Sequence, residues 1–111
     1  AQRVRRAGAR AMATLLGEVD LIASPTALTG PPPLDDMDFP SIADAVTTQV
    51  WNALGLPAVS VPMGLADGGP AGLQLAGRAF EDALVLRAAD ALQHVTGFHL
   101  AVPPPATEER P

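Results

Sequence analysis

The sequence contains no cysteine, no lysine and no tyrosine. Without cysteine, the chain can form neither a disulfide framework nor a thiolate metal site. Without lysine, any mechanism that depends on a lysine base must take that base from outside these 111 residues. The absent residue types therefore limit the catalysis that the chain can perform alone.

Long apolar runs are also missing. No run reaches the ~18 residues that a membrane span needs, so we expect no membrane contact. The chain begins with alanine rather than methionine, and no signal-type apolar core follows its first arginines. We expect that it begins inside a longer polypeptide. We also expect a cytoplasmic location, which the absence of cysteine fits but does not by itself establish.

Positive charge is scarce beyond the first ten residues. Residues 1–10 carry four arginines and no acid, whereas residues 11–111 carry three arginines against twelve acids. This excess of negative charge argues against a nucleic-acid-binding surface over most of the chain.

Metal and cofactor sites have little support in the sequence. Asp35, Asp36 and Asp38 lie on a proline-rich loop without further ligands nearby, and His94 and His99 lack a convincing third ligand. The only Gly-Gly pair, at 68–69, lies in a turn and does not open a helix, so it is not a phosphate cradle. We expect neither a metal nor a cofactor.

Helical periodicity and turn residues divide the first half of the chain. Apolar spacing predicts a helix over 2–17, and a short apolar run predicts a buried strand over 19–23. A loop follows over 27–40. A second helix is expected over 42–54, with Ser41 as its N-cap and Asp44 at the capping-box position. Because this helix has few charges, we expect its Trp51 to be shielded only when further chain covers it.

Alternation and helix signals divide the second half. Alternating residues over 59–65 and 72–76, separated by Asp-Gly-Gly-Pro at 67–70, predict an antiparallel hairpin. A last helix begins near Glu81 and ends at Gly97. Its predicted apolar stripe consists of Leu84, Ala88, Ala91, Leu92 and Val95. The prediction is an α/β fold of about three strands and three helices over 1–102, with a disordered tail over 103–111.

The three serines do not form a recognisable nucleophile site. A nucleophilic serine needs a base within reach and an oxyanion hole. Ser24 precedes a proline at the end of a predicted strand, Ser60 lies inside a strand and Ser41 begins a helix. None lies in a glycine-rich nucleophile elbow, so we expect structural roles for them.

Four segments in order resemble the amidase signature family. Residues 52–62 resemble that family's Asn-x-x-Gly-x-Pro-Ala-x-Ser-x-Pro segment, and Gly-Leu-Gln-Leu-Ala-Gly-Arg follows at 72–78. Phe80 and Glu81 then lead into the closing helix. Upstream, residues 20–26 resemble the strand and loop that precede the substrate pocket. The similarity covers about residues 3–100.

The resemblance implies the C-terminal portion of an amidase domain, in which a mixed sheet is flanked by helices. The family's enzymes cleave a carboxamide to ammonia with a serine nucleophile, a bridging serine and a lysine base, and they use no metal. The nucleophile segment lies upstream of the matched part, so the resemblance transfers no catalytic residue to this chain. It implies substrate-binding positions at Thr48 and Asp44.

Three functions fit these observations. The first is a fragment of an amidase that hydrolyses small amides, whose partner is the missing N-terminal part of its own domain. The second is the A subunit of a tRNA-dependent amidotransferase. Those subunits carry aspartate three residues before the threonine matched by Thr48, whereas this chain has Ala45 there and Asp44 one residue away. The third is a non-catalytic remnant or interaction module. For the isolated chain we expect self-association through an unpaired strand edge.

Overall fold

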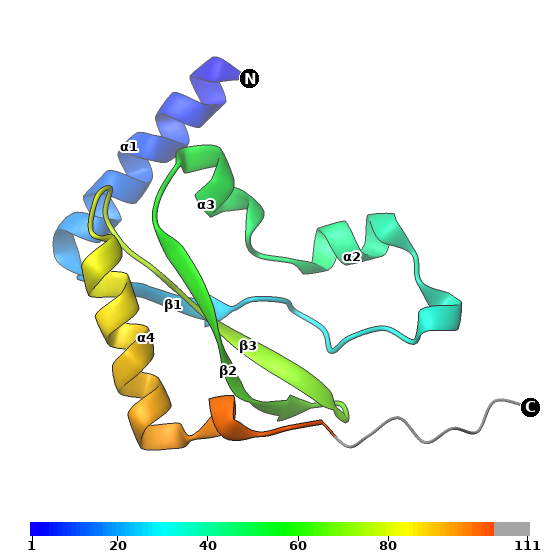
Figure 1. The fold of residues 1–111 in the computed structure, drawn as a ribbon. Coiled ribbons are helices and arrows are strands. Elements are labelled where there is room, and N and C mark those ends of the chain that lie inside the picture. The colour runs from blue at the N-terminus through cyan, green and yellow to red at the C-terminus, as the bar shows by residue number, and fades with distance from the viewer. Residues whose placement is uncertain (104–111) are drawn as a thin grey trace, which may run out of the picture.

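The computed structural model describes residues 1–103 (Figure 1), so residues 104–111 of the predicted tail lie outside the described range. Two single-turn 3₁₀ helices, at Leu34–Asp36 and Phe98–Leu100, accompany the main elements. The main elements are α1 (Gln2–Glu18), β1 (Ile22–Pro25), α2 (Phe39–Ala45), α3 (Gln49–Leu54), β2 (Ala58–Ala66), β3 (Gly69–Ala76) and α4 (Asp82–Thr96). The predicted α/β class is confirmed.

The described strands form one antiparallel sheet in the order β1-β3-β2. The predicted hairpin is confirmed and slightly longer than expected. Its two-residue turn, Asp67-Gly68, has φ values of 52° and 77°, the left-handed pattern that matches the twist of a hairpin. Pro62 is tolerated because β2 is an edge strand, and the register shifts between Pro62 and Gly64. The first strand runs later than predicted, so Ser24 and Pro25 belong to it.

One face of the sheet is apolar and packs against α4. Val61 and Leu75 from the sheet meet Val85 and Ala89 from the helix, which are all buried. The predicted stripe on α4 is therefore partly wrong. The helix face that meets the sheet is centred on Val85 and Ala89, so Val95 is 81% exposed and Ala91 is also exposed.

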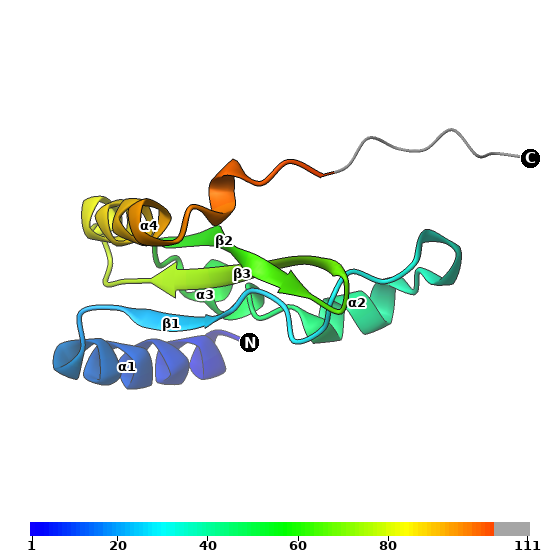
Figure 2. The same ribbon diagram turned by 90° about the horizontal axis from the view of Figure 1, so that it is seen from below.

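The opposite face of the sheet is polar. Ser24 and Ser60 both lie directly across from Gln74 in the register of β3. Residues directly opposite in a sheet point to the same side, so these polar side chains share a face. Figure 2 shows α4 on one side of the sheet and α1, α2 and α3 on the other. The sheet thus separates an apolar core from a polar layer.

The predicted helix over 42–54 is broken into α2 and α3. Val46 forms an isolated bridge with Ala27, and the backbone N–H of Thr47 donates to the carbonyl of Thr26 at 3.0 Å. Val46, Thr47 and Thr48 are a β-branched run, which helices disfavour. The predicted N-cap is also wrong, because Asp38 caps α2 and Ser41 donates to it. Asp44 consequently has no capping role and lies exposed on α2.

The predicted first helix is confirmed, but most of its apolar face is uncovered within the described residues. Leu16 is 2% exposed, whereas Val4 is 77% exposed. Trp51 is only 6% exposed, so the expectation that this chain alone leaves it uncovered is wrong. The described residues suffice to bury the indole, although its N–H has no acceptor among them.

Arg78 ties the end of α1 to the start of α4. Its guanidinium donates to the carbonyl oxygens of Leu16 at 2.7 Å and Val19 at 3.1 Å. It also pairs with Asp20 at 3.2 Å and Glu81 at 2.8 Å. Both carboxylates raise the pKa of Arg78, Glu81 more strongly. One side chain therefore joins residues 16–20 to the start of α4.

None of the helices within residues 1–103 combines the length and the apolar character that a membrane-spanning helix needs.

Candidate functional site

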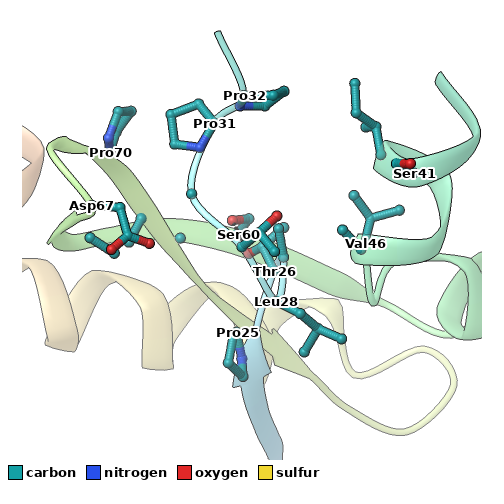
Figure 3. Close-up of a pocket in the computed structure, with 18 of the residues that line it drawn as sticks. Pro25, Thr26, Leu28, Pro31, Pro32, Ser41, Val46, Ser60, Asp67 and Pro70 are labelled. Atoms are coloured by element: carbon teal, nitrogen blue, oxygen red, sulfur yellow. Dashed lines mark hydrogen bonds between the residues drawn. The ribbon is translucent and has the colours of Figure 1, made fainter. Parts of the chain in front are cut away.

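A hollow of about 840 Å³ opens on the polar side of the sheet (Figure 3). Three parts of the chain form its walls: the segment that follows β1, helix α2, and the turn end of the β2–β3 hairpin. Apolar side chains line much of it, including Leu28, Ile42, Val46 and Met63. The hydroxyl groups that line it belong to Thr26, Thr29, Ser41 and Ser60.

We call this hollow the cavity. Thr26 and Ser60 form a hydroxyl pair at its centre. Their oxygens lie 2.5 Å apart, although the residues are 34 positions apart in the sequence. The backbone N–H of Thr26 donates to the carbonyl of Gly72 at 2.9 Å, which extends the pairing of β1 with β3. Figure 3 shows both hydroxyl side chains meeting between the walls.

Gly72 lies directly beneath the hydroxyl pair. A Cβ atom at this position would come within 2.6 Å of the Ser60 oxygen and 2.9 Å of the Thr26 oxygen. No side chain fits there without displacing one of the two hydroxyls. The central strand therefore lacks a side chain at the position where the pair sits.

Gln74 anchors the segments around the pair. It is 3% exposed, and its side-chain N–H₂ points to the hydroxyls of Thr47 at 3.3 Å and Ser24 at 3.4 Å. The Thr47 hydroxyl in turn donates to the carbonyl of Pro25 at 2.6 Å. A buried amide with hydrogen-bond partners fixes its surroundings, because losing those partners is costly. Gln74 thereby holds the break between α2 and α3 against the end of β1.

Prolines stiffen the mouth of the cavity. Pro31 packs so closely over Gly69 that a Cβ atom on the glycine would clash with the proline ring. Pro32 and Pro70 also line the opening (Figure 3). The loop after β1 is therefore seated on the hairpin end, which preserves the shape of the cavity.

The charges that line the cavity are all negative within the described residues. They belong to Asp36, Asp38 and Asp67. Hydrogen bonds from the Ser41 hydroxyl and backbone N–H lower the pKa of Asp38, so this carboxyl stays ionised to a lower pH than an ordinary aspartate. No group of three or more metal-ligating side chains occurs in residues 1–103. The cavity therefore offers hydroxyls and carboxylates, with no cationic group from this part of the chain.

The two residues implied as substrate-binding lie outside the cavity lining. Asp44 is exposed on α2, whereas its neighbour Ala45 does line the cavity. Thr48 is half-buried at the start of α3 and makes no capping hydrogen bond. Ser24 accepts from Gln74, and Ser60 lies in a strand as predicted but also faces the cavity.

Thr26, Thr47 and Gln74 were not predicted from the sequence as members of this site. A signal did exist for Gln74, since it is a polar residue within an alternating apolar run. The meeting of Thr26 with Ser60 depends on strand order and on a crossover between β1 and β3, which local patterns do not reveal.

Comparisons with known proteins agree with this fold. The chain is 41% identical over 109 residues to the A subunit of the glutamyl-tRNA(Gln) amidotransferase of Syntrophomonas wolfei, covering 95% of this chain and 22% of that protein. The crystal structure of the corresponding protein from Thermotoga maritima superposes with a TM-score of 0.77 at 32% identity, over 82% of this chain and 21% of that one. The peptide amidase of Stenotrophomonas maltophilia gives a TM-score of 0.66 at 27% identity, over 96% and 21%.

The chain thus spans about a fifth of the length of the curated relatives that it matches. A family model described as Amidase matches residues 1–86, which is most of the chain and includes the strands and the cavity floor. The order of the sequence segments, the observed hairpin and the family-model match all indicate the same family. This chain belongs to the amidase signature family.

Proposed function

We propose that this chain is the C-terminal portion of an amidase domain whose full-length protein hydrolyses a carboxamide to a carboxylate and ammonia. Membership of the amidase family carries the proposal. The chain has no lysine, and its three serines lie in strands or on a helix. The family resemblance therefore implies that the serine nucleophile, the bridging serine and the lysine base come from the rest of the polypeptide.

In this proposal the cavity forms one wall of the substrate pocket. It is open on one side, lined by apolar residues and equipped with a few polar groups, as small-molecule sites usually are. The rest of the domain would close the open side and bring the nucleophile to the scissile carbonyl. This chain would orient the acyl part of the substrate and exclude water from it.

An A subunit of a tRNA-dependent amidotransferase is the second candidate. Relatives of that name from two bacteria are each 41% identical to this chain, which favours it. The position where those subunits carry aspartate is Ala45, and its methyl group faces the cavity. A methyl group there suits a neutral acyl chain better than the charged end of glutamine. We therefore favour simple amides as substrates.

Ammonia release by the full-length protein tests these alternatives. We expect release from neutral aliphatic amides, and a kcat/KM for glutamine that is roughly tenfold or more lower. Ala45→Asp should reduce the difference in kcat/KM between neutral amides and glutamine. Preference for glutamine, with ammonia passed to charged tRNA when partner subunits are present, would select the amidotransferase. No release from any amide would favour the non-catalytic remnant.

The isolated 111-residue chain serves as the matched negative control, and we expect no ammonia release from it. Release that disappears on Ser60→Ala or Ser24→Ala would reveal a nucleophile within this chain. The substrate-binding roles of Thr48 and Asp44 remain predictions. Thr48→Val and Asp44→Asn in the full-length protein test them, and a raised KM with unchanged kcat is the expected result.

A further inference from the structure

We infer that the hydroxyl pair of Thr26 and Ser60 determines substrate specificity, by hydrogen-bonding a neutral polar group on the acyl part of the amide. The inference rests on the proposed function, because it takes the cavity as the substrate pocket. It adds a class of substrate: amides whose acyl chain carries a hydroxyl group or a second carboxamide.

The number of protons on the two hydroxyls determines what the pair can offer a ligand. Each hydroxyl has one proton and two acceptor lone pairs. The mutual bond at 2.5 Å uses one of the two protons. The second proton has no acceptor among the side-chain hydrogen bonds of the described residues. The pair can therefore donate one hydrogen bond to a ligand and also accept from it.

The surrounding backbone holds the two hydroxyls in a fixed position in the cavity. Both side chains line the cavity, and the strand beneath them has glycine at position 72, where any Cβ would press on both oxygens. The backbone on either side is fixed, since Thr26 bonds to Gly72 and Thr47 bonds to the carbonyls of Pro25 and Thr26. A preorganised donor and acceptor distinguish ligands better than a mobile one does.

The other side chains that line the cavity determine which charge on a ligand they can accommodate. Leu28, Val46 and Met63 add apolar side chains to the lining that the pair belongs to, and the ionisable groups that this chain adds to the lining are carboxylates. An anionic acyl group would face those carboxylates without a compensating cation from this wall. A hydroxyl or carboxamide both donates and accepts, so it satisfies the pair without adding charge.

Paired substrates test the inference in the full-length protein. Butanamide, pentanamide and hexanamide are each compared with the amide that carries a hydroxyl on the terminal carbon. The measured quantity is the ratio of kcat/KM for the hydroxylated amide to that for the plain amide. A site built to hydrogen-bond a hydroxyl rejects a ligand without it, so this ratio should exceed one for at least one chain length in the wild type.

Thr26→Val and Ser60→Ala should each reduce that ratio by roughly five- to tenfold, the worth of one hydrogen bond. Thr96→Val is the matched control, because its hydroxyl bonds within α4 to Leu92, away from the cavity. It should leave the ratio unchanged. The ratio is internal to each variant, so a variant that folds poorly loses both activities together and its ratio remains interpretable.

A wild-type enzyme that cleaves amides with a ratio that neither substitution changes would overturn the inference and leave the proposed function intact. A preference for a terminal carboxylate over the hydroxyl would overturn it as well. An enzyme that cleaves no amide in the series would contradict the proposed function, and the substrate role of the pair with it.

Discussion

Gly72 is the residue on which the geometry of the cavity floor depends. Its missing side chain leaves room for two hydroxyls, one from the segment that follows β1 and one from β2. The residue pattern around it, in which Leu73 and Leu75 alternate with Gly72, Gln74 and Ala76, predicts a strand but gives no indication of what lies above the glycine. The functional meaning of this position therefore appears only in the tertiary structure.

Gly72→Ala in the full-length protein should lower the free energy of unfolding by about 1–3 kcal/mol, because the new methyl group overpacks the hydroxyl pair. In a Ser60→Ala background the same change should cost less, since the closest oxygen is gone. A double-mutant cycle measured by chemical denaturation checks this coupling. Strictly additive effects would show that the two positions do not touch.

Much of the candidate site could not be predicted from local patterns. Ser60 and Gln74 could be assigned to strands, because alternation marks both. Their pairing with Thr26 and Ser24 could not be predicted, because it requires β3 to lie between β1 and β2. The hydroxyl pair was not predicted because it depends on the order of the strands, and not because the strand propensities are weak.

Helix α2 shows how one cap moves the start of an element. Ser41 is the N-cap predicted from the sequence, but Asp38 takes that role and accepts hydrogen bonds from Ser41. Asp38 begins the helix earlier, with Pro40 in its first turn, where proline is tolerated. The β-branched residues 46–48 then end it earlier than the predicted helix.

The lowered pKa of Asp38 predicts a pH dependence for α2. A carboxyl whose pKa is lower when folded contributes stability that is complete above its ordinary value of 3.8 and is lost as the pH falls through the lower, folded value. We expect amide exchange in residues 39–45 to accelerate on acidification below about 4. Asp38→Asn keeps a cap without the charge, so it should remove this dependence. An unchanged pH profile in that variant would exclude Asp38 as the titrating group.

Arg78 links the end of α1 to the start of α4, so replacing it should weaken this connection. Replacing it with methionine should lower the melting temperature of the full-length protein and speed amide exchange at the end of α1, because the carbonyls of Leu16 and Val19 lose their donor. Arg78→Lys should resemble the methionine variant more than the wild type, since an ammonium cannot reproduce the planar fork. Full recovery by lysine would show that charge alone matters.

At the scale of the molecule, the chain has more apolar surface than its own core covers. Within the described residues, β1 and β2 are both sheet edges, and α1 exposes Val4 and Leu15. The matched relatives are about five times as long. The fold class and hairpin could be predicted because they depend on local periodicity, whereas the coverage of these surfaces depends on contacts far along the chain.

The isolated 111-residue chain should therefore self-associate, increasingly so as salt rises. Its net charge of −5 opposes association at low ionic strength, but screening shortens the reach of that repulsion to about 8 Å near 0.15 M salt. Sedimentation across a salt series, with a dye that reports apolar surface, checks this. A monomer that binds no dye at any salt concentration would mean that these residues close their own core.

Hydrogen exchange of the full-length protein, with and without a slowly cleaved hydroxylated amide, tests the central claim that this chain forms a wall of the substrate pocket. The account predicts slower exchange in residues 27–30, which line the cavity, and no change in α4 on the opposite face of the sheet. Protection confined to other parts of the protein, with residues 27–30 unaffected, would contradict it.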